Sequence, residues 1–195
     1  MKKHKLGVIL AGGKSRRFGA PKAFAEREGK KFYEYSLQAL MPHTDSQVII
    51  TSAALMDRFT QTSGIGLKVY TDQEPFAGKG PLAGLYTAME NERAEWYVTI
   101  PIDVPFMEAW VYEALLAYAD EQTDAVIPVT PRKHPLIAVY NYSIKNQLQE
   151  NLENEKLSVR ELLEKIRVKF VPVNNEKPFI NINSQEDFKK SISTD

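Results

Sequence analysis

The chain has 195 residues, 43% of them hydrophobic and 26% charged, which is enough to bury a core and is typical of globular proteins. Lysine plus arginine and aspartate plus glutamate each number 25, so no net charge draws the chain to nucleic acid or to an anionic membrane. The chain lacks cysteine, which excludes disulfides and thiolate chemistry, and its longest run of hydrophobic residues, residues 114–119, is too short for a membrane span. The apolar run near the start, residues 8–11, is too short for a signal peptide. We therefore expect a cytoplasmic enzyme or binding domain.

Short apolar runs alternate along the chain with segments of helical periodicity. Seven runs predict strands, several of them apolar at consecutive positions as in parallel strands covered on both faces, at residues 6–10, 47–51, 67–70, 97–100, 125–129, 136–140 and 168–171. Helical patterns fall between them, beginning at Tyr33, Leu82, Val111 and Val159. Capping-box spacing marks two helix starts, at Ser158 with Glu161 and at Ser184 with Asp187. The alternation predicts an α/β fold with a mostly parallel sheet, in which ligands gather at the carboxyl ends of the strands.

A glycine-rich loop follows the first predicted strand. Gly12 and Gly13 let the backbone turn tightly and bring its N–H groups near a ligand, where a Cβ would clash. Four cationic residues lie within nine positions of this loop, at Lys14, Arg16, Arg17 and Lys22. Clustered cations beside exposed N–H groups suit a polyphosphate. The spacing matches neither G-x-G-x-x-G nor G-x-x-x-x-G-K-[ST], which disfavours both a Rossmann dehydrogenase and a P-loop protein.

The stretch LAGGKSRRFGAPK, from Leu10 to Lys22, is similar to the signature L-A-G-G-x-S-x-R-x-G-x-x-K of the molybdenum cofactor guanylyltransferases, the MobA family. Sugar-phosphate and methylerythritol-phosphate nucleotidyltransferases of the same superfamily usually show L-A-A-G, so the glycine pair Gly12-Gly13, together with Ser15, favours the guanylyl branch. Phe18 stands where the family commonly has methionine. The resemblance extends over nearly the whole chain. It implies one Rossmann-like, three-layer domain over residues 1–195, resembling the nucleotide-diphospho-sugar transferases and having a mostly parallel, mixed sheet, with a nucleotide half at about 1–105 and an acceptor half at about 106–195.

The segment Gly80-Pro81-Leu82-Ala83-Gly84 has two features of a ligand-binding turn. Its glycines allow the close approach of a flat ligand, and Pro81 suits the first turn of a helix. The resemblance places G-P-L-x-G beside the nucleotide base and gives Asp72 a part in nucleotide binding. It implies a nucleotide site made of Leu10, Ala11, Gly12, Gly13, Lys22, Asp72, Gly80, Pro81, Leu82, Gly84, Asp103, Asn181 and Asn183. A loop that simply precedes a helix is the alternative.

Asp103 ends the predicted strand run that begins at Tyr97. A carboxylate at the end of a central strand is costly unless it is solvated or paired. Magnesium suits this position, because it often takes one or two protein carboxylates together with phosphate oxygens and waters. The D-x-P triplet resembles the metal-binding aspartate motif of the superfamily. A turn or N-cap aspartate is the alternative interpretation.

Residues 179–184 alternate apolar and polar side chains and predict a further strand with Asn181 and Asn183 on one face. The family usually shows N-[IL]-N-T-P-E-D here, and this chain keeps the cap but lacks the proline. The resemblance implies that both asparagines help to hold the metal–phosphate assembly or the pterin acceptor, and a polar strand face is the alternative. His134 lies in a segment similar to P-L-x-A-[LV]-Y, and we expect it to have a structural or acceptor-contact role because the histidines lack ligand spacing.

The resemblance implies transfer of GMP from GTP to the phosphate of molybdopterin or Mo-molybdopterin, with release of pyrophosphate and formation of molybdopterin guanine dinucleotide. Arg17, Lys22 and Asp103 are the implied catalytic residues, with Asp103 holding Mg²⁺. Other proteins of cofactor biosynthesis or molybdoenzyme maturation are candidate partners, whereas nucleic acid and membrane are not expected. Two alternatives stay open: a cytidylyltransferase or other nucleotidyltransferase of the same fold, and a non-catalytic GTP-binding adaptor.

Overall fold

The computed structural model describes residues 4–13, 18–62, 67–72, 74–184 and 186–188. Within them, seven strands form one sheet in the order β5-β4-β1-β6-β8-β7-β9. Their bounds are β1 Lys5–Leu10, β4 Ser46–Thr51, β5 Lys68–Thr71, β6 Trp96–Pro101, β7 Ala125–Val129, β8 Ala138–Asn141 and β9 Val168–Pro172. All seven predicted strands are therefore present, with ends that differ by two residues or fewer. A separate hairpin consists of β2 Glu26–Arg27 and β3 Lys30–Lys31.

The sheet is mixed but mostly parallel, as predicted for an α/β fold. Strands β5, β4, β1 and β6 run parallel to one another. Strand β8 runs antiparallel to both β6 and β7, and β9 returns parallel to β7. The chain leaves β1 to build β4 and β5 on one side and then crosses to build β6 on the other side. This reversal beside β1 is the position where α/β sheets open a crevice for ligands.

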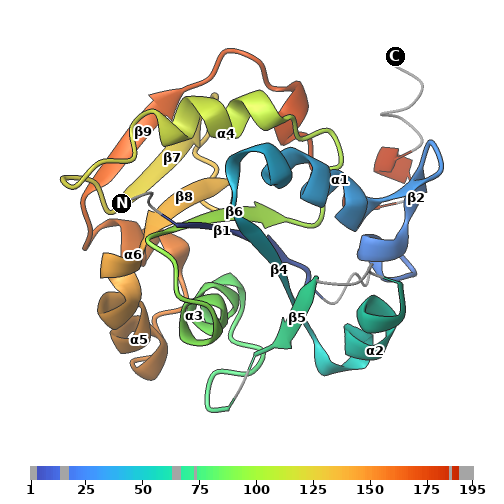
Figure 1. Ribbon diagram of the computed structural model, residues 1–195, viewed down its shortest axis with the longest axis horizontal. Helices are drawn as coiled ribbons and strands as arrows, with labels where there is room; N and C mark the ends of the chain where they lie inside the picture. The colour runs from blue at the N-terminus through green and yellow to red at the C-terminus, as the bar shows by residue number, and fades with distance from the viewer. Residues whose placement is uncertain (1–3, 14–17, 63–66, 73, 185, 189–195) are drawn as a thin grey trace.

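Helices cover both faces of the sheet and complete three layers (Figure 1). One face packs against α1 Phe32–Leu40, α2 Ala53–Thr62 and α4 Ala109–Leu116. The other packs against α3 Pro81–Asn91, α5 Lys145–Glu153 and α6 Val159–Leu163. Four short 3₁₀ helices lie between these elements, at η1 Lys22–Phe24, η2 Met41–His43, η3 Tyr142–Ile144 and η4 Lys177–Phe179. Val8 and Ile9 of β1 face opposite layers, and both are fully buried, which explains the consecutive apolar residues of this strand.

The predicted strand at residues 179–184 is wrong. Phe179 closes η4, and residues 180–183 belong to no strand. The alternation of the sequence survives locally, because Ile182 is fully buried while Asn181 and Asn183 are exposed. The Ile182 N–H donates to the Asp103 carbonyl oxygen at 2.8 Å. The alternating pattern therefore reflects one anchored apolar side chain rather than a sheet ladder.

The two predicted capping boxes have different outcomes. Ser158 is the N-cap of α6, but its side chain makes no capping hydrogen bond, so that box is wrong. At the second position, the Ser184 N–H donates to Asp187 Oδ2 at 2.9 Å, and the Asp187 N–H donates to Ser184 Oγ at 3.0 Å. This reciprocal pair is the capping box that the sequence predicts, and it opens the helical turn at residues 186–188.

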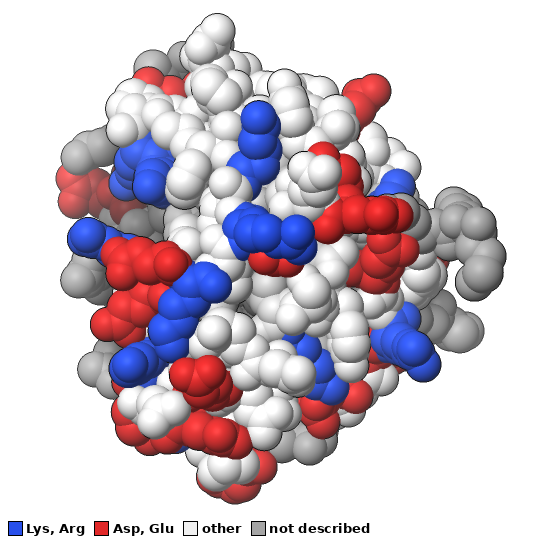
Figure 2. Space-filling model, turned by 90° about the vertical axis from the view of Figure 1, so that its left-hand side faces the viewer, with Lys and Arg blue, Asp and Glu red and all other residues white. Residues whose placement is uncertain are grey.

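Charged side chains of both signs are mixed over the β9 end of the molecule. Figure 2 shows this face, where cations and carboxylates lie side by side rather than in separate fields. Arg167 makes a two-pronged pair with Asp124, with Nε–Oδ2 at 3.0 Å and Nη2–Oδ1 at 2.7 Å. This pairing lowers the pKa of Asp124 to about 2. It ties the start of β9 to the start of β7.

In the described part of the chain, no helix has the length and apolarity needed to cross a bilayer.

Candidate functional site

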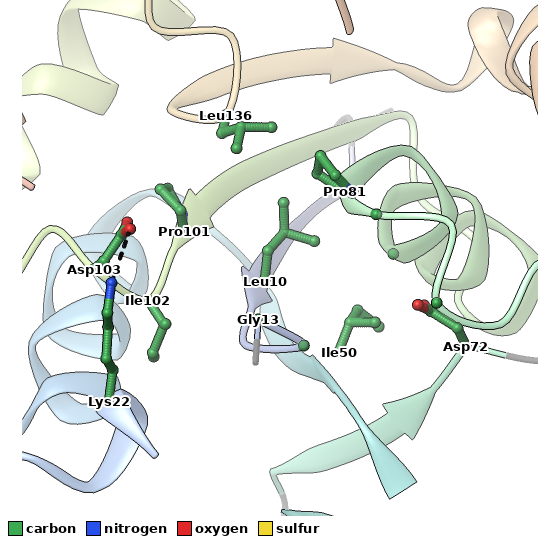
Figure 3. A pocket seen from close by; sticks show the side chains of 14 residues that line it. Leu10, Gly13, Lys22, Ile50, Asp72, Pro81, Pro101, Ile102, Asp103 and Leu136 are labelled. Carbon is green, nitrogen blue, oxygen red and sulfur yellow. Dashed lines mark ion pairs between the residues drawn. The ribbon is translucent and has the colours of Figure 1, made fainter. Parts of the chain in front are cut away.

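A cavity of about 410 Å³ opens at the carboxyl ends of the central parallel strands (Figure 3). Its walls come from the ends of β1, β4 and β6, from the loop before α3 and from the β7–β8 hairpin. The lining residues are Leu10, Gly12, Gly13, Lys22, Ile50, Asp72, Gly78, Gly80, Pro81, Gly84, Pro101, Ile102, Asp103 and Leu136. Nine of the thirteen residues implied by the motif resemblance line this one cavity.

The polar side chains of the cavity lie at opposite ends. Figure 3 shows Lys22 and Asp103 together at one end and Asp72 at the other, with apolar side chains such as Leu10 and Ile50 between them. A ligand that spans the cavity therefore meets a charge pair at one end and a single carboxylate at the other. Between the two ends it lies against an apolar wall.

The charge pair joins three segments that are distant in sequence. Lys22 Nζ lies 3.6 Å from Asp103 Oδ2 and donates to Asn183 Oδ1 at 2.9 Å. Only 11% of the Lys22 side chain and 23% of the Asp103 side chain are exposed. Partial burial weakens solvent screening, so both groups act more strongly on a bound ion than surface charges would. The arrangement offers a cation to phosphate oxygens and a carboxylate to a divalent metal.

Asp72 follows β5 at the other end of the cavity. The Thr87 hydroxyl, on α3, donates to Asp72 Oδ1 at 3.3 Å. Burial raises the pKa of Asp72, and the hydrogen bonds from Thr87 and the Gly78 backbone act in the opposite direction. An ionised carboxylate only accepts hydrogen bonds, so in that form this end of the cavity would suit a ligand edge that carries donors.

The loop before α3 needs its glycines for two different reasons. Gly80 is the N-cap of α3 with a φ of 82°, which disfavours any residue with a Cβ, and Pro81 occupies the first helical turn as predicted. A Cβ on Gly84 would lie 2.9 Å from Leu10 Cδ2 and 3.9 Å from Asp72 Oδ1. Gly84 therefore first allows α3 to pack closely against β1, in addition to bordering the cavity.

Replacing Gly84 by alanine is expected to push Leu10 or α3 outward and to narrow the cavity beside Asp72. Overpacking of this kind costs about 1–3 kcal/mol of stability, and we expect nucleotide affinity to fall about tenfold as well. Gly7→Ala is the matched control, because an added Cβ there would lie 3.1 Å from Gln47 Cγ and from Leu40 Cδ1, outside the cavity lining, so it should lower the melting temperature and leave nucleotide affinity unchanged. Melting temperature and nucleotide titration of both variants check this. An unchanged melting temperature for Gly84→Ala would contradict the packing role.

Four of the residues implied by the resemblance do not line the cavity. Ala11 and Leu82 are each 2% exposed and belong to the core, with the Ala11 N–H donating to Ile50 O at 2.7 Å. Asn183 contacts the site indirectly, because its Oδ1 accepts a hydrogen bond from Lys22 Nζ. Asn181 is exposed and lies two residues before Asn183 in the sequence. Arg17, together with Lys14 and Arg16, lies outside the described residues.

His134 has a structural setting. It is 9% exposed, its Nε2 lies 2.8 Å from the Thr130 hydroxyl oxygen, and its ring centroid is 4.5 Å from that of Phe179. Burial, assisted by Arg132, lowers the pKa of His134 and favours the neutral ring. These contacts brace the β7–β8 hairpin that brings Leu136 to the cavity.

Sequence reasoning missed several apolar and backbone members of the cavity wall: Ile50, Gly78, Pro101, Ile102 and Leu136. Two signals could have found most of them. Ile50, Pro101 and Ile102 stand at the carboxyl ends of predicted strands, where ligands gather. Leu136 belongs to the segment that resembles P-L-x-A-[LV]-Y. Gly78 had no signal of its own beyond its nearness to Gly80.

The residues at the charged end fit a magnesium ion that arrives with a polyphosphate. In the described ranges, no three histidine or acidic side chains gather into a metal cage. Asp103 supplies one carboxylate facing the cavity, and magnesium commonly needs only one or two protein carboxylates when phosphate oxygens and waters complete its shell. The donor set is therefore suited to a metal–nucleotide complex.

Comparisons with known proteins match nearly the whole chain. The MobA-like NTP transferase domain matches residues 7–170. A probable molybdenum cofactor guanylyltransferase of Halalkalibacterium halodurans is 42% identical over 193 residues, covering 95% of this chain and 96% of the relative. A protein of the same description from Bacillus subtilis is 39% identical over 188 residues, covering 94% of this chain and 92% of the relative.

Solved structures share the fold. Molybdopterin-guanine dinucleotide biosynthesis protein A of Archaeoglobus fulgidus has a TM-score of 0.79 at 24% identity, covering 97% of each chain. The 4-diphosphocytidyl-2C-methyl-D-erythritol synthase of Anaerococcus prevotii has a TM-score of 0.77 at 15% identity, covering 98% of each chain. At these identities the likeness shows the fold alone.

Proposed function

The chain belongs to the family of MobA-like NTP transferases, and from this membership we propose that it transfers GMP from GTP to the phosphate of molybdopterin or Mo-molybdopterin. The products are pyrophosphate and molybdopterin guanine dinucleotide. The observation that carries the proposal is the polarity of the cavity, with Lys22 and Asp103 at one end and Asp72 at the other. This spacing of groups suits a nucleotide with its triphosphate at the first end and its base at the second.

The carboxylate of Asp72 favours guanine over the other bases. Guanine presents two adjacent donors, N1–H and the 2-amino group, to an acceptor. Adenine and cytosine present a donor beside an acceptor, and the donor of uracil stands between two acceptors. A carboxylate that only accepts hydrogen bonds disfavours a base whose acceptor atom would face it, because the lone pairs of the base and of the carboxylate would then repel each other.

The charged end of the cavity supports attack of one anion on another. An oxygen of the acceptor phosphate forms a bond to the α-phosphorus of GTP, the bond from that phosphorus to the bridging oxygen of the β-phosphate breaks, and pyrophosphate leaves. A phosphate monoester has a second pKa of about 6, so the nucleophile needs no general base at neutral pH. The task of the protein is positioning and charge neutralisation.

The residues of the chain divide this task. The backbone of residues 10–13 lies along the nucleotide, and the Lys22 ammonium neutralises phosphate oxygens while Asn183 orients it. Arg17 is proposed to add a second cation. Asp103 would hold Mg²⁺, which when bound supplies further charge neutralisation to the triphosphate. Asn181 and the half at about residues 106–195 are proposed to face the pterin acceptor, in a cytoplasmic reaction whose protein partners would belong to cofactor biosynthesis or molybdoenzyme maturation.

In a pyrophosphate-release assay with molybdopterin present, we expect GTP to be preferred over ATP, CTP and UTP. The physical reason is the donor edge of guanine facing Asp72. The same assay without molybdopterin is the control and should release little pyrophosphate.

Each alternative has its own signature in this assay. A preference for CTP with the acceptor present would reassign the chain to cytidylyl transfer, which the shared fold also permits. Binding of GTP without release of pyrophosphate in the presence of the acceptor would indicate a non-catalytic adaptor.

A further inference from the structure

Thr87 is a buried hydroxyl residue that the proposed reaction does not use directly. It lies in the second half of α3 and is 5% exposed. Its hydroxyl donates to Asp72 Oδ1 at 3.3 Å, across 15 positions of the chain. The bond therefore joins a core helix to the carboxylate at the base end of the cavity.

Hydrogen-bond donors favour the ionised form of a partly buried carboxylate such as Asp72. Removal from water favours the neutral acid, whereas a hydrogen bond donated to the carboxylate favours the charged form. Both effects act on the pKa of Asp72, which burial raises and the Thr87 hydroxyl lowers. A neutral Asp72 would present its own O–H donor to the donor edge of guanine, and the match would be lost.

The bond also limits rotation of the carboxylate. Gly84 borders the same side chain, since a Cβ there would be 3.9 Å from Asp72 Oδ1. The Gly78 backbone gives a further hydrogen bond from the loop before α3. A carboxylate offers about four acceptor positions, so these two bonds leave acceptor capacity for a ligand.

We propose that Thr87 is a positioning residue for base selection, which holds Asp72 as an ionised and oriented double acceptor for the N1–H and 2-amino donors of guanine. This rests on the proposed GTP specificity. The inference assigns the end of the cavity at Asp72 to 6-oxopurine nucleoside triphosphates, whose affinity should increase with the number of donors that face this carboxylate. GTP offers both donors, ITP keeps only N1–H, and XTP places an oxygen where guanine has its 2-amino group.

Direct nucleotide binding to the full chain tests this inference without the acceptor. Thr87→Val removes the hydroxyl with little change of shape, and Thr87→Ser retains it. We expect Thr87→Val to weaken GTP binding about tenfold, the scale of about 1.4 kcal/mol for one lost hydrogen bond to a charged group. The binding of ITP should weaken less, so the ratio of GTP affinity to ITP affinity should decrease in Thr87→Val. Thr87→Ser should keep the wild-type GTP affinity and the wild-type ratio.

A matched control removes a different buried hydroxyl. Thr99 is 1% exposed and donates to Ala138 O at 3.2 Å within the sheet. Thr99→Val should therefore lower the melting temperature without altering the GTP to ITP ratio. With acceptor added, Thr87→Val should raise KM for GTP and leave kcat at saturating GTP nearly unchanged, because Thr87 does not touch the reacting phosphates.

Three outcomes separate the inference from the function on which it rests. Unchanged GTP affinity in Thr87→Val, in a protein whose wild type prefers GTP, would overturn the role of Thr87 alone. Equal losses in Thr87→Ser and Thr87→Val would also overturn it, because the hydroxyl would not be the cause. A wild type that binds CTP more tightly than GTP would instead overturn the guanylyl assignment itself.

Discussion

Replacing Lys22 by alanine is expected to reduce the rate of GMP transfer about a hundredfold or more, the scale seen when a preorganised charge partner of a transition state is removed. The Lys22 side chain is 11% exposed and its ammonium is held by Asp103 and Asn183, so water cannot simply take its place. Steady-state kinetics at saturating GTP measure the effect. The fall should appear mainly in kcat, because charge develops on the phosphates during transfer.

The partial burial of Lys22 makes a second variant necessary. Lys22→Ala leaves a gap and deprives Asp103 of its cation, so some stability is lost together with activity. Lys22→Met keeps most of the side-chain volume and should show a similar fall in kcat. Lys30→Ala, at an exposed lysine whose Nζ lies 3.2 Å from Gln38 Oε1, controls for loss of a cation. Near-normal rates in Lys22→Met would exclude Lys22 from the reacting centre.

Asp103→Asn is expected to lower turnover far more than GTP affinity. The amide has the size of the carboxylate but lacks the charge that would hold Mg²⁺ against water. The triphosphate can still bring magnesium with it, so binding of GTP should weaken only modestly, whereas transfer loses its template and counter-charge. Melting temperature, GTP affinity and turnover should be measured on the same variant. Turnover should also require a higher magnesium concentration to reach its plateau.

A structural aspartate provides the comparison for this variant. Asp45 Oδ2 accepts the Lys5 N–H at 2.9 Å at the start of β1, far from the cavity lining. An asparagine side chain can still accept this hydrogen bond through its amide oxygen, so we expect Asp45→Asn to cost at most about 0.5–1.5 kcal/mol of stability and to leave the chemistry intact. If Asp103→Asn behaved in the same way, with a lowered melting temperature but normal turnover per folded molecule, the metal role of Asp103 would be wrong.

The sequence alone located the seven strands of the sheet and the glycine-rich loop that borders the cavity. Strands such as β1 and β6 are covered on both faces, so their consecutive apolar residues mark them without any knowledge of their neighbours. The glycine and cation pattern from Leu10 to Lys22 predicted a phosphate-binding loop, and its likeness to the MobA signature is confirmed by the domain match over residues 7–170. Both predictions depend on residues that are neighbours in the sequence, so they need no knowledge of the tertiary structure.

Two helices, α2 and α5, were not predicted, and few of their side chains are buried in the core. The nine residues of α5 are mostly polar, with Leu148 and Leu152 as the apolar pair that enters the core. In α2, Phe59 is fully buried among mostly exposed or partly exposed residues. Tertiary burial of so few side chains stabilises such helices, since short helices are marginal by themselves.

Only the tertiary structure decided how the site is held together. Lys22 lies 161 positions before Asn183, yet the two side chains are hydrogen-bonded, and a lysine in a glycine-rich loop gives no sign of being 11% exposed. Gly84 resembled a ligand contact, whereas its missing Cβ first makes room for Leu10. Thr87 is an ordinary helix residue until the fold places its hydroxyl on Asp72. Burial and hydrogen-bond partners depend on every element around a residue, so they follow from the packing of the layers and not from local spacing.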